Sequence, residues 1–261
     1  MAGSRALPSL AAALLLVAGR AVAAPYEWPP GERDGTIESR LAPPAGATRI
    51  ALAPGSFAAW LRGLPVRPAA APVRLFDGRL KSRQDLHAAV VDLDLPRRDL
   101  QQCADAAMRL RAEYLFAHRR FAHITFHPEP GRATKLAYSG GADRRRFARY
   151  LIRLFADAGT ASLAAELPRP GRSPVLPGDL LIQGGHPGHA VVVLDVAEGA
   201  GRRYLLLGQS YMPAQDFHVL KNLHAPALSP WFDEATLDGG GLQTPEWRPF
   251  SRQDVRRFGD P

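Results

Sequence analysis

The chain of 261 residues is short of three features that often indicate a function or a location. It has one cysteine, Cys103, so no internal disulfide can form. Lysine is scarce, and arginine supplies nearly all of the positive charge. Beyond the first 24 residues no apolar run approaches the roughly 20 residues that a membrane-spanning helix needs. These shortages exclude a disulfide-stapled scaffold and predict no transmembrane segment in the mature chain.

Several catalytic motifs are also missing. There is no Gly-x-Ser-x-Gly elbow and no zinc-protease motif, and the pairs His123/His127 and His186/His189 have no evident third metal ligand. We therefore expect no metal and no cofactor. The arginines are scattered apart from 144–146, which argues against a nucleic-acid partner.

The N-terminus predicts export. Arg5 precedes an apolar run over 6–18, and Ala21-Val-Ala23 matches a cleavage signal. We predict a signal peptide over 1–23 and a periplasmic or secreted mature protein. Subtracting Arg5 and Arg20 from the formal net charge of +8 leaves about +6, which favours an anionic partner such as a cell-wall polymer.

Residues 24–49 are rich in proline and glycine and predict an extended arm or linker. Residues 50–261 then predict one α+β domain, because helical patterns come first and antiparallel strand patterns follow. Helices are expected over 56–61, 100–116, 143–155 and 161–167. Strands are expected over 73–80 (a hairpin), 86–93, 123–127, 178–182, 189–194 and 203–207.

Cys103 lies near the start of the predicted helix 100–116, with Asp99 as the expected N-cap. A thiol in the first turn of a helix is stabilised as thiolate by the helix dipole, which predicts a nucleophile with a lowered pKa. The alternative is a structural residue, because free cysteine is often buried and Cys103 lies on the apolar stripe of this helix.

A nucleophilic thiol needs a base and a group that orients the base. A hairpin centred on residue 199 would pair Asp195 with Arg203, place two aliphatic pairs below them, and set His189 directly opposite Gln209. We therefore expect His189 as the base and Gln209 as its orienting partner. Asp195 is too far along the same strand, roughly 20 Å from His189, to take that place.

Cys103 at a helix start, the segment Pro177-Gly-Asp-Leu-Leu181, His189-Ala-Val-Val-Val193 and Gln209 together resemble the NlpC/P60 cell-wall peptidases, which are papain-like. The resemblance covers roughly 99–212 and implies Cys103 as nucleophile and His189 as general base and acid. Two segments, starting at Asp99 and at Gln209, also resemble an uncharacterised family of exported bacterial proteins. The chain departs from NlpC/P60 in having Gln-Cys-Ala instead of Asp-Cys-Ser, and Gln209 where histidine is usual.

These observations predict an exported cysteine hydrolase of papain-like architecture that cleaves amides, with a cell-wall peptide or other envelope substrate as partner. The Cys103 backbone N–H is the expected oxyanion donor. Side-chain candidates for the oxyanion or the cleft are Gln102, Gln84, Tyr211 and His186. Two alternatives remain: a non-catalytic envelope-ligand binding protein, and a papain-like acyltransferase or lipid amidase.

Overall fold

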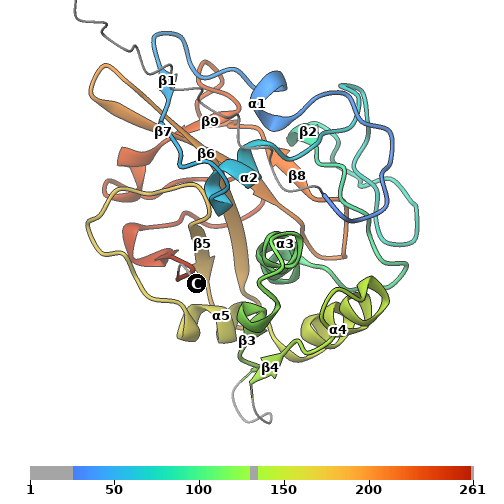
Figure 1. Ribbon diagram of the computed structural model, residues 1–261. Helices are drawn as coiled ribbons and strands as arrows, with labels where there is room; N and C mark the ends of the chain where they lie inside the picture. Colours follow the sequence, from blue (N-terminus) through green and yellow to red (C-terminus); the bar gives the residue numbers. More distant parts are fainter. Residues whose placement is uncertain (1–25, 130–134, 260–261) are drawn as a thin grey trace, which may run out of the picture.

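The computed structural model describes residues 26–129 and 135–259. The predicted signal peptide lies outside these residues. The chain forms a mixed α/β fold around an eight-stranded, antiparallel sheet (Figure 1). The strands follow the order β10-β5-β6-β7-β8-β2, and β1 and β9 add to β6 and β7. Their bounds are β1 Thr48–Arg49, β2 His87–Val90, β5 Leu180–Gln183, β6 His189–Gly199, β7 Arg202–Gln209, β8 His218–Leu220, β9 Trp231–Asp233 and β10 Val255–Arg256.

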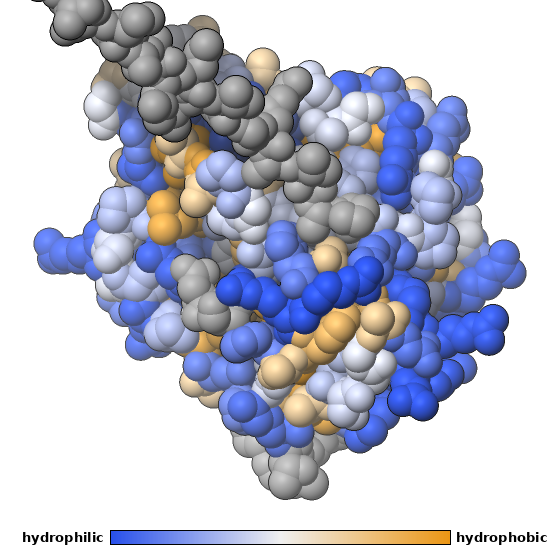
Figure 2. Space-filling view, viewed as in Figure 1, coloured by the Kyte–Doolittle hydropathy of each residue, from blue (hydrophilic) through white to orange (hydrophobic). Residues whose placement is uncertain are grey.

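The longest helix, α3 (Cys103–Ala117), packs against β6 and is buried almost throughout. A two-stranded sheet joins β3 and β4 beside it. The remaining elements are α1 Ile37–Arg40, α2 Phe57–Arg62, η1 Phe121–His123, β3 Thr125–Phe126, β4 Leu136–Ala137, α4 Arg144–Asp157, α5 Thr160–Glu166, η2 Glu234–Leu237 and η3 Arg252–Asp254. Figure 2 shows that hydrophilic side chains cover most of the face seen in Figure 1, with apolar patches between them.

Two apolar clusters lie on opposite faces of the sheet. Along β6, Ala190, Val192 and Leu194 join the larger cluster with α2, α3 and α4. Val191 and Val193 join the smaller cluster with residues of the C-terminal segment. This alternation follows from the two-residue period of a strand. His189 therefore shares the face of Val191, opposite to the face that α3 covers.

The segment predicted as a linker, 24–49, is part of the domain over its described residues. It forms α1 and β1, and it contributes Trp28, Ile37 and Leu41 to the larger core cluster. Proline and glycine shape its turns, but its three large apolar side chains supply enough buried surface to hold it in place. No division at residue 49 is visible.

The predicted hairpin register is wrong because the turn is centred between Ala200 and Gly201 and not on residue 199, and a β-bulge then changes the register along the strand. Near the turn Glu198 pairs with Arg203, but beyond a register shift between Val193 and Asp195 the pairing becomes Val192 with Gly208. The extra residue in β6 shifts the pairing by one position, which exchanges the faces of the strand relative to β7. The predicted Asp195–Arg203 ion pair is absent: Asp195 instead accepts from Arg49 and Arg62, at 2.6 and 2.7 Å.

Candidate functional site

Cys103 is the first residue of α3, and a carboxylate within the helix, not Asp99, satisfies the helix start. Asp105 Oδ2 accepts hydrogen bonds from the backbone N–H groups of Gln101 (3.1 Å) and Gln102 (2.9 Å). Asp99 lies before the helix and accepts from the Ala214 N–H at 2.7 Å. The helix therefore begins three residues later than predicted, because the cap reaches back from the third helical position.

The Cys103 thiol lies against the first peptide bond of β6. The backbone N–H of Ala190 lies close enough to the sulfur to lower the pKa of the thiol. The ladder between β6 and β7 begins only at the pair Val192 and Gly208, so β7 leaves this N–H without a strand partner. The end of β6 thus brings the thiol within one peptide unit of His189.

The expected low pKa of the thiol is not found. The pKa of Cys103 is raised to about 11, mainly by burial and also by the nearby Asp105 charge. The N–H groups of Ala190, Ala104 and Cys103 act in the opposite direction without overcoming burial. Desolvation of the thiolate outweighs the helix dipole here, because Cys103 is only 5% exposed. The resting group is a neutral thiol.

His189 and Gln209 make the predicted contact. His189 Nε2 lies 2.8 Å from Gln209 Oε1, although the two residues are diagonal neighbours and not direct partners across β6 and β7. The bulge makes this possible, since the register near the turn would put the two side chains on opposite faces. The prediction succeeded because an error of two residues in register leaves a side chain on the same face.

Glu246 and Lys81 extend this pair into a buried chain of four side chains. Gln209 Nε2 donates to Glu246 Oε2 at 2.9 Å, and Lys81 Nζ donates to Glu246 Oε1 at 2.6 Å. An ionised carboxylate only accepts, so the Gln209 amide must turn its NH₂ toward Glu246 and its oxygen toward His189. His189 Nε2 then carries the proton, which leaves Nδ1 with a lone pair, as a general base requires.

Aromatic rings enclose the imidazole. The Tyr211 and Trp247 rings lie 4.9 and 5.1 Å from the His189 ring, and Phe250 lies 6.2 Å away. Tyr211 also donates to the Glu246 carbonyl oxygen at 2.9 Å. Burial lowers the pKa of His189 to about 4, with the Gln209 hydrogen bond acting in the opposite direction. The imidazole is therefore neutral at pH 7.

Ser210 and Gln101, two polar residues that the sequence did not single out, connect the segment before Cys103 to the end of β7. Ser210, next to Gln209, donates to the Gln101 carbonyl at 2.9 Å. Gln101 has a φ of 71°, in the left-handed region, and it is fully buried. Its side-chain oxygen accepts from Arg109. Left-handed backbone is uncommon outside glycine, and such strain is held where the surroundings fix it, often at functional sites.

The other predicted residues have different positions. Gln84 uses both amide hydrogens on the carbonyls of Val73 (2.9 Å) and Lys81 (2.8 Å), so it has none left to donate to an oxyanion. Gln102 lines the pocket at Cys103 and donates to Asp99 at 3.1 Å. His186 lies at the same pocket with an 80% exposed side chain.

The pocket beside Cys103 has a volume of about 360 Å³. It lies between the start of α3, the start of α5 and the loop 184–188 that leads into His189. Gly188 is required there, because a Cβ would come within 2.7 Å of the Gly185 carbonyl and 2.8 Å of that of Gln183. The lining residues are Gln102, Cys103, Ala104, Asp105, Phe155, Ala158, Gly159, Thr160, Gly185, His186, Pro187, Gly188 and Met212.

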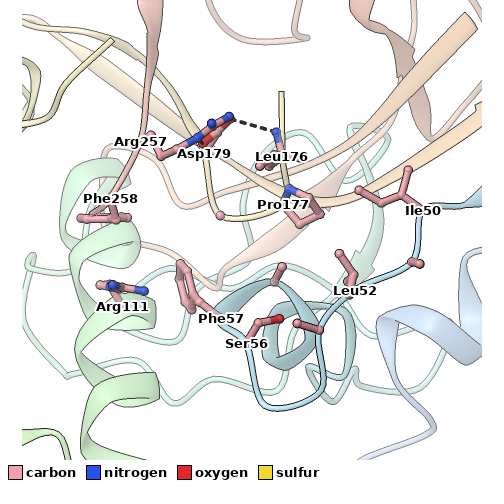
Figure 3. Close-up of a pocket in the computed structure, with 14 residues that line it drawn as sticks. Ile50, Leu52, Ser56, Phe57, Arg111, Leu176, Pro177, Asp179, Arg257 and Phe258 are labelled. Atoms are coloured by element: carbon pink, nitrogen blue, oxygen red, sulfur yellow. Dashed lines mark hydrogen bonds and ion pairs between the residues drawn. The ribbon is translucent and has the colours of Figure 1, made fainter. Parts of the chain in front are cut away.

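Gly178 and Asp179 lie at a different pocket, of about 290 Å³ (Figure 3). Asp179 binds Arg257 through both oxygens at 2.7 Å and accepts from the Leu176 N–H at 2.9 Å. Gly178 has a φ of 99° and packs against Phe57. The pair thus fixes the turn into β5 and holds the C-terminal segment.

The described residues hold neither a membrane-spanning helix nor a cluster of metal ligands. No helix within 26–129 or 135–259 is long and apolar enough to cross a membrane. Within the same ranges, no group of three or more histidine, cysteine, aspartate or glutamate side chains is arranged to hold a metal ion.

Comparison with curated proteins and with solved structures found no match. A family profile, Domain of unknown function (4846), matches residues 37–139 and 132–257. These segments include Cys103, His189, Gln209 and Glu246, and they cover most of the chain. The protein therefore belongs to the family described as Domain of unknown function (4846).

Proposed function

We propose that the protein is a cysteine hydrolase that cleaves amide bonds, with Cys103 as nucleophile and His189 as general base and acid. The observation that carries the proposal is the chain His189–Gln209–Glu246–Lys81. This chain leaves Nδ1 of His189 unprotonated. The ring lies on the face of β6 opposite to α3, among Tyr211, Trp247 and Phe250, so the reaction requires it to turn around the strand end toward the Cys103 thiol.

The reaction starts from a neutral thiol and a neutral imidazole. His189 removes the thiol proton as the sulfur bonds to the substrate carbonyl carbon, and the oxygen charge is stabilised by N–H groups at the start of α3. The imidazolium then protonates the leaving amine, and the C–N bond breaks to leave a thioester on Cys103. His189 next deprotonates a water that attacks the thioester, and the released sulfur regains the proton.

The substrate proposed is a peptide amide of the bacterial envelope. It is supported by the predicted leader and by the basic net charge, which favours anionic wall polymers. A papain-like chain trace is likewise part of this proposal, supported by a helix that presents a thiol to the end of an antiparallel sheet. An acyltransferase or lipid amidase would use the same Cys103 and His189 on a different carbonyl.

A non-catalytic binding protein is the second candidate. It is favoured by the burial of both reacting groups, since Cys103 is 5% and His189 1% exposed, and by the raised pKa of the thiol. In this case the pocket beside Cys103 would hold a ligand without covalent chemistry.

The rate of Cys103 alkylation by iodoacetamide, followed against pH, tests the proposal. Because Cys103 is the only cysteine, the label reports on one site. The wild type, His189→Ala and Gln209→Ala are compared, with His127→Ala as a control histidine that is exposed and paired with Glu166.

If His189 assists the thiol, alkylation of the wild type at pH 7 is faster than in His189→Ala by on the order of tenfold or more, because general-base assistance contributes factors of this size or larger. Gln209→Ala falls between them and His127→Ala matches the wild type. Equal, slow labelling in all four proteins, with fast labelling only after unfolding, would refute the hydrolase and favour the binding protein.

A further inference from the structure

The pocket beside Cys103 differs in charge from the rest of this basic protein. No lysine or arginine is among its lining residues. Four other pockets, of about 230–370 Å³, are each lined by at least one arginine. In a chain with 33 basic residues, an arginine-free pocket at the candidate nucleophile is a specific feature of the site.

One carboxylate, Asp105, lines this pocket and is 6% exposed. Its Oδ2 accepts the two N–H groups that cap α3. Its Oδ1 accepts no hydrogen bond from the residues that the structure describes, and no cationic side chain is paired with it there. Because Asp105 lines the pocket, this oxygen can accept a hydrogen bond from a ligand bound there.

A second carboxylate, Glu129, lies next to the residues that line the pocket. Glu129 Oε1 accepts from the Ser162 N–H at 3.4 Å, and a Cβ on Gly159 would lie 2.7 Å from the same oxygen. Glu129 Oε2 is 3.9 Å from the exposed ring of His186. The pocket thus meets negative charge at its floor and beside its wall.

We propose that this pocket binds an ammonium group of the substrate, with Asp105 Oδ1 as its acceptor. The inference names a substrate class for the proposed hydrolase and in that respect rests on the proposed function. An ammonium group carries one positive charge and up to three N–H donors, one of which can bind the Oδ1 atom of Asp105 in a charge-assisted hydrogen bond. Burial raises the pKa of Asp105 to about 7, and a bound cation would favour its ionised form.

The shared pocket places the ammonium close to the scissile bond. Cys103 and Asp105 both line it, and their Cα atoms are about 5–6 Å apart in α3. Side chains two positions apart leave a helix in different directions, but Asp105 reaches back over the helix start to the N–H groups of Gln101 and Gln102. At about 3.3 Å per residue of extended peptide, the ammonium belongs one or two residues from the attacked carbonyl. A free peptide N-terminus or the side-chain amine of a diamino acid could supply it.

Charged thiol reagents test the pocket without requiring turnover. The folded protein is labelled with 2-aminoethyl methanethiosulfonate, which carries an ammonium, and with 2-sulfonatoethyl methanethiosulfonate, which carries a sulfonate. The ratio of the two rates, divided by the ratio for glutathione, cancels the intrinsic reactivity of the thiol. Asp105→Asn keeps an oxygen for the cap, and Asp143→Asn is the matched control, because Asp143 caps α4 through the N–H groups of Arg145 and Arg146.

The wild type and Asp143→Asn should prefer the ammonium reagent by on the order of tenfold, and Asp105→Asn should lose most of that preference. An unchanged ratio in Asp105→Asn, a wild-type ratio equal to that of glutathione, or no labelling of the folded protein by either reagent would each overturn the proposal. Failure of the hydrolase proposal is seen separately, as an alkylation rate that His189→Ala does not change while the charge preference persists.

Protection from labelling then identifies the source of the ammonium. Three blocked dipeptides are compared: alanyl-alanine amide, its N-acetyl form, and N-acetyl-lysyl-alanine amide. Protection by the first alone assigns a free N-terminus, and protection by the third assigns a side-chain amine. Protection by the N-acetyl-alanyl form equal to the other two would contradict ammonium recognition.

Discussion

The ion pair between Lys81 and Glu246 is linked to the candidate base His189 through Gln209. Removing this ion pair should lower the free energy of unfolding by an amount that can be estimated from the structure. The side chains are 7% and 16% exposed and their charged atoms are 2.6 Å apart. Lys81 Nζ also lies 3.4 Å from Gln215 Oε1, and its charge lies over the Tyr211 ring at 5.5 Å. Glu246 is thus the anion that this buried ammonium contacts directly.

Glu246→Gln keeps the volume but leaves Lys81 without its counter-charge. Removing one partner of a buried pair costs about 3–5 kcal/mol, and the partial exposure of Glu246 places the expected loss at the lower end, about 3 kcal/mol. In a domain of this size that corresponds to a fall in Tm of about 6–12 °C. The double variant Lys81→Met/Glu246→Gln has no orphaned charge, and it should recover about 2 kcal/mol of the loss.

Urea unfolding followed by tryptophan fluorescence measures the four free energies of this cycle. Lys81→Met alone completes it and leaves Glu246 paired with Gln209 only. If Glu246→Gln lies within 0.5 kcal/mol of the wild type, or if the double variant is no more stable than Glu246→Gln, the ion pair is not what holds Gln209 and the argument for a fixed His189 tautomer fails.

Two further predictions concern buried charge and pH. Asp195→Asn leaves Arg49 and Arg62 without their shared carboxylate and should lower the free energy of unfolding by about 3–5 kcal/mol. Asp85→Asn, at the exposed pair with Arg83, is the control and should leave the urea midpoint unchanged; equal effects in both variants would contradict the assignment. His218 is fully buried, and burial lowers its pKa to about 3. The unfolded state therefore binds more protons between about pH 6.5 and pH 3, so this histidine makes the protein lose stability as the pH falls through that window. Relative to the wild type, His218→Gln should gain stability with decreasing pH below 6.5, measured by thermal unfolding; a pH-independent difference would show that the ring is not buried neutral.

Local sequence patterns predicted much of the secondary structure, because helical spacing and strand alternation are set by which faces are buried. Helices were expected at 56–61, 100–116 and 143–155, and the structure has them at Phe57–Arg62, Cys103–Ala117 and Arg144–Asp157. The mixed α/β fold with an antiparallel sheet was predicted for the same reason. The linker prediction for 24–49 failed, since composition does not show which apolar side chains find a core.

The residues of the candidate site also fall into two groups, those that the sequence indicates and those that only the structure brings in. Cys103, His189 and Gln209 could be chosen from the sequence, because a thiol at a helix start and a polar pair on adjacent strands have local signatures. Glu246 and Lys81 could not, since they lie far from these residues in sequence and carry no motif. Only the tertiary structure brings them to Gln209 and thereby decides which nitrogen of His189 holds the proton.

The sequence by itself thus determined the types of reacting group and the elements that carry them, which depend on interactions within a few residues. The tertiary structure decided the register between β6 and β7, the protonation of His189 and Cys103, and the charge of the pocket beside Cys103. The bulge in β6 sets which side chains share a face with His189. Burial, which depends on packing between distant segments, raises the pKa of Cys103 and leaves Asp105 as the one carboxylate lining an arginine-free pocket.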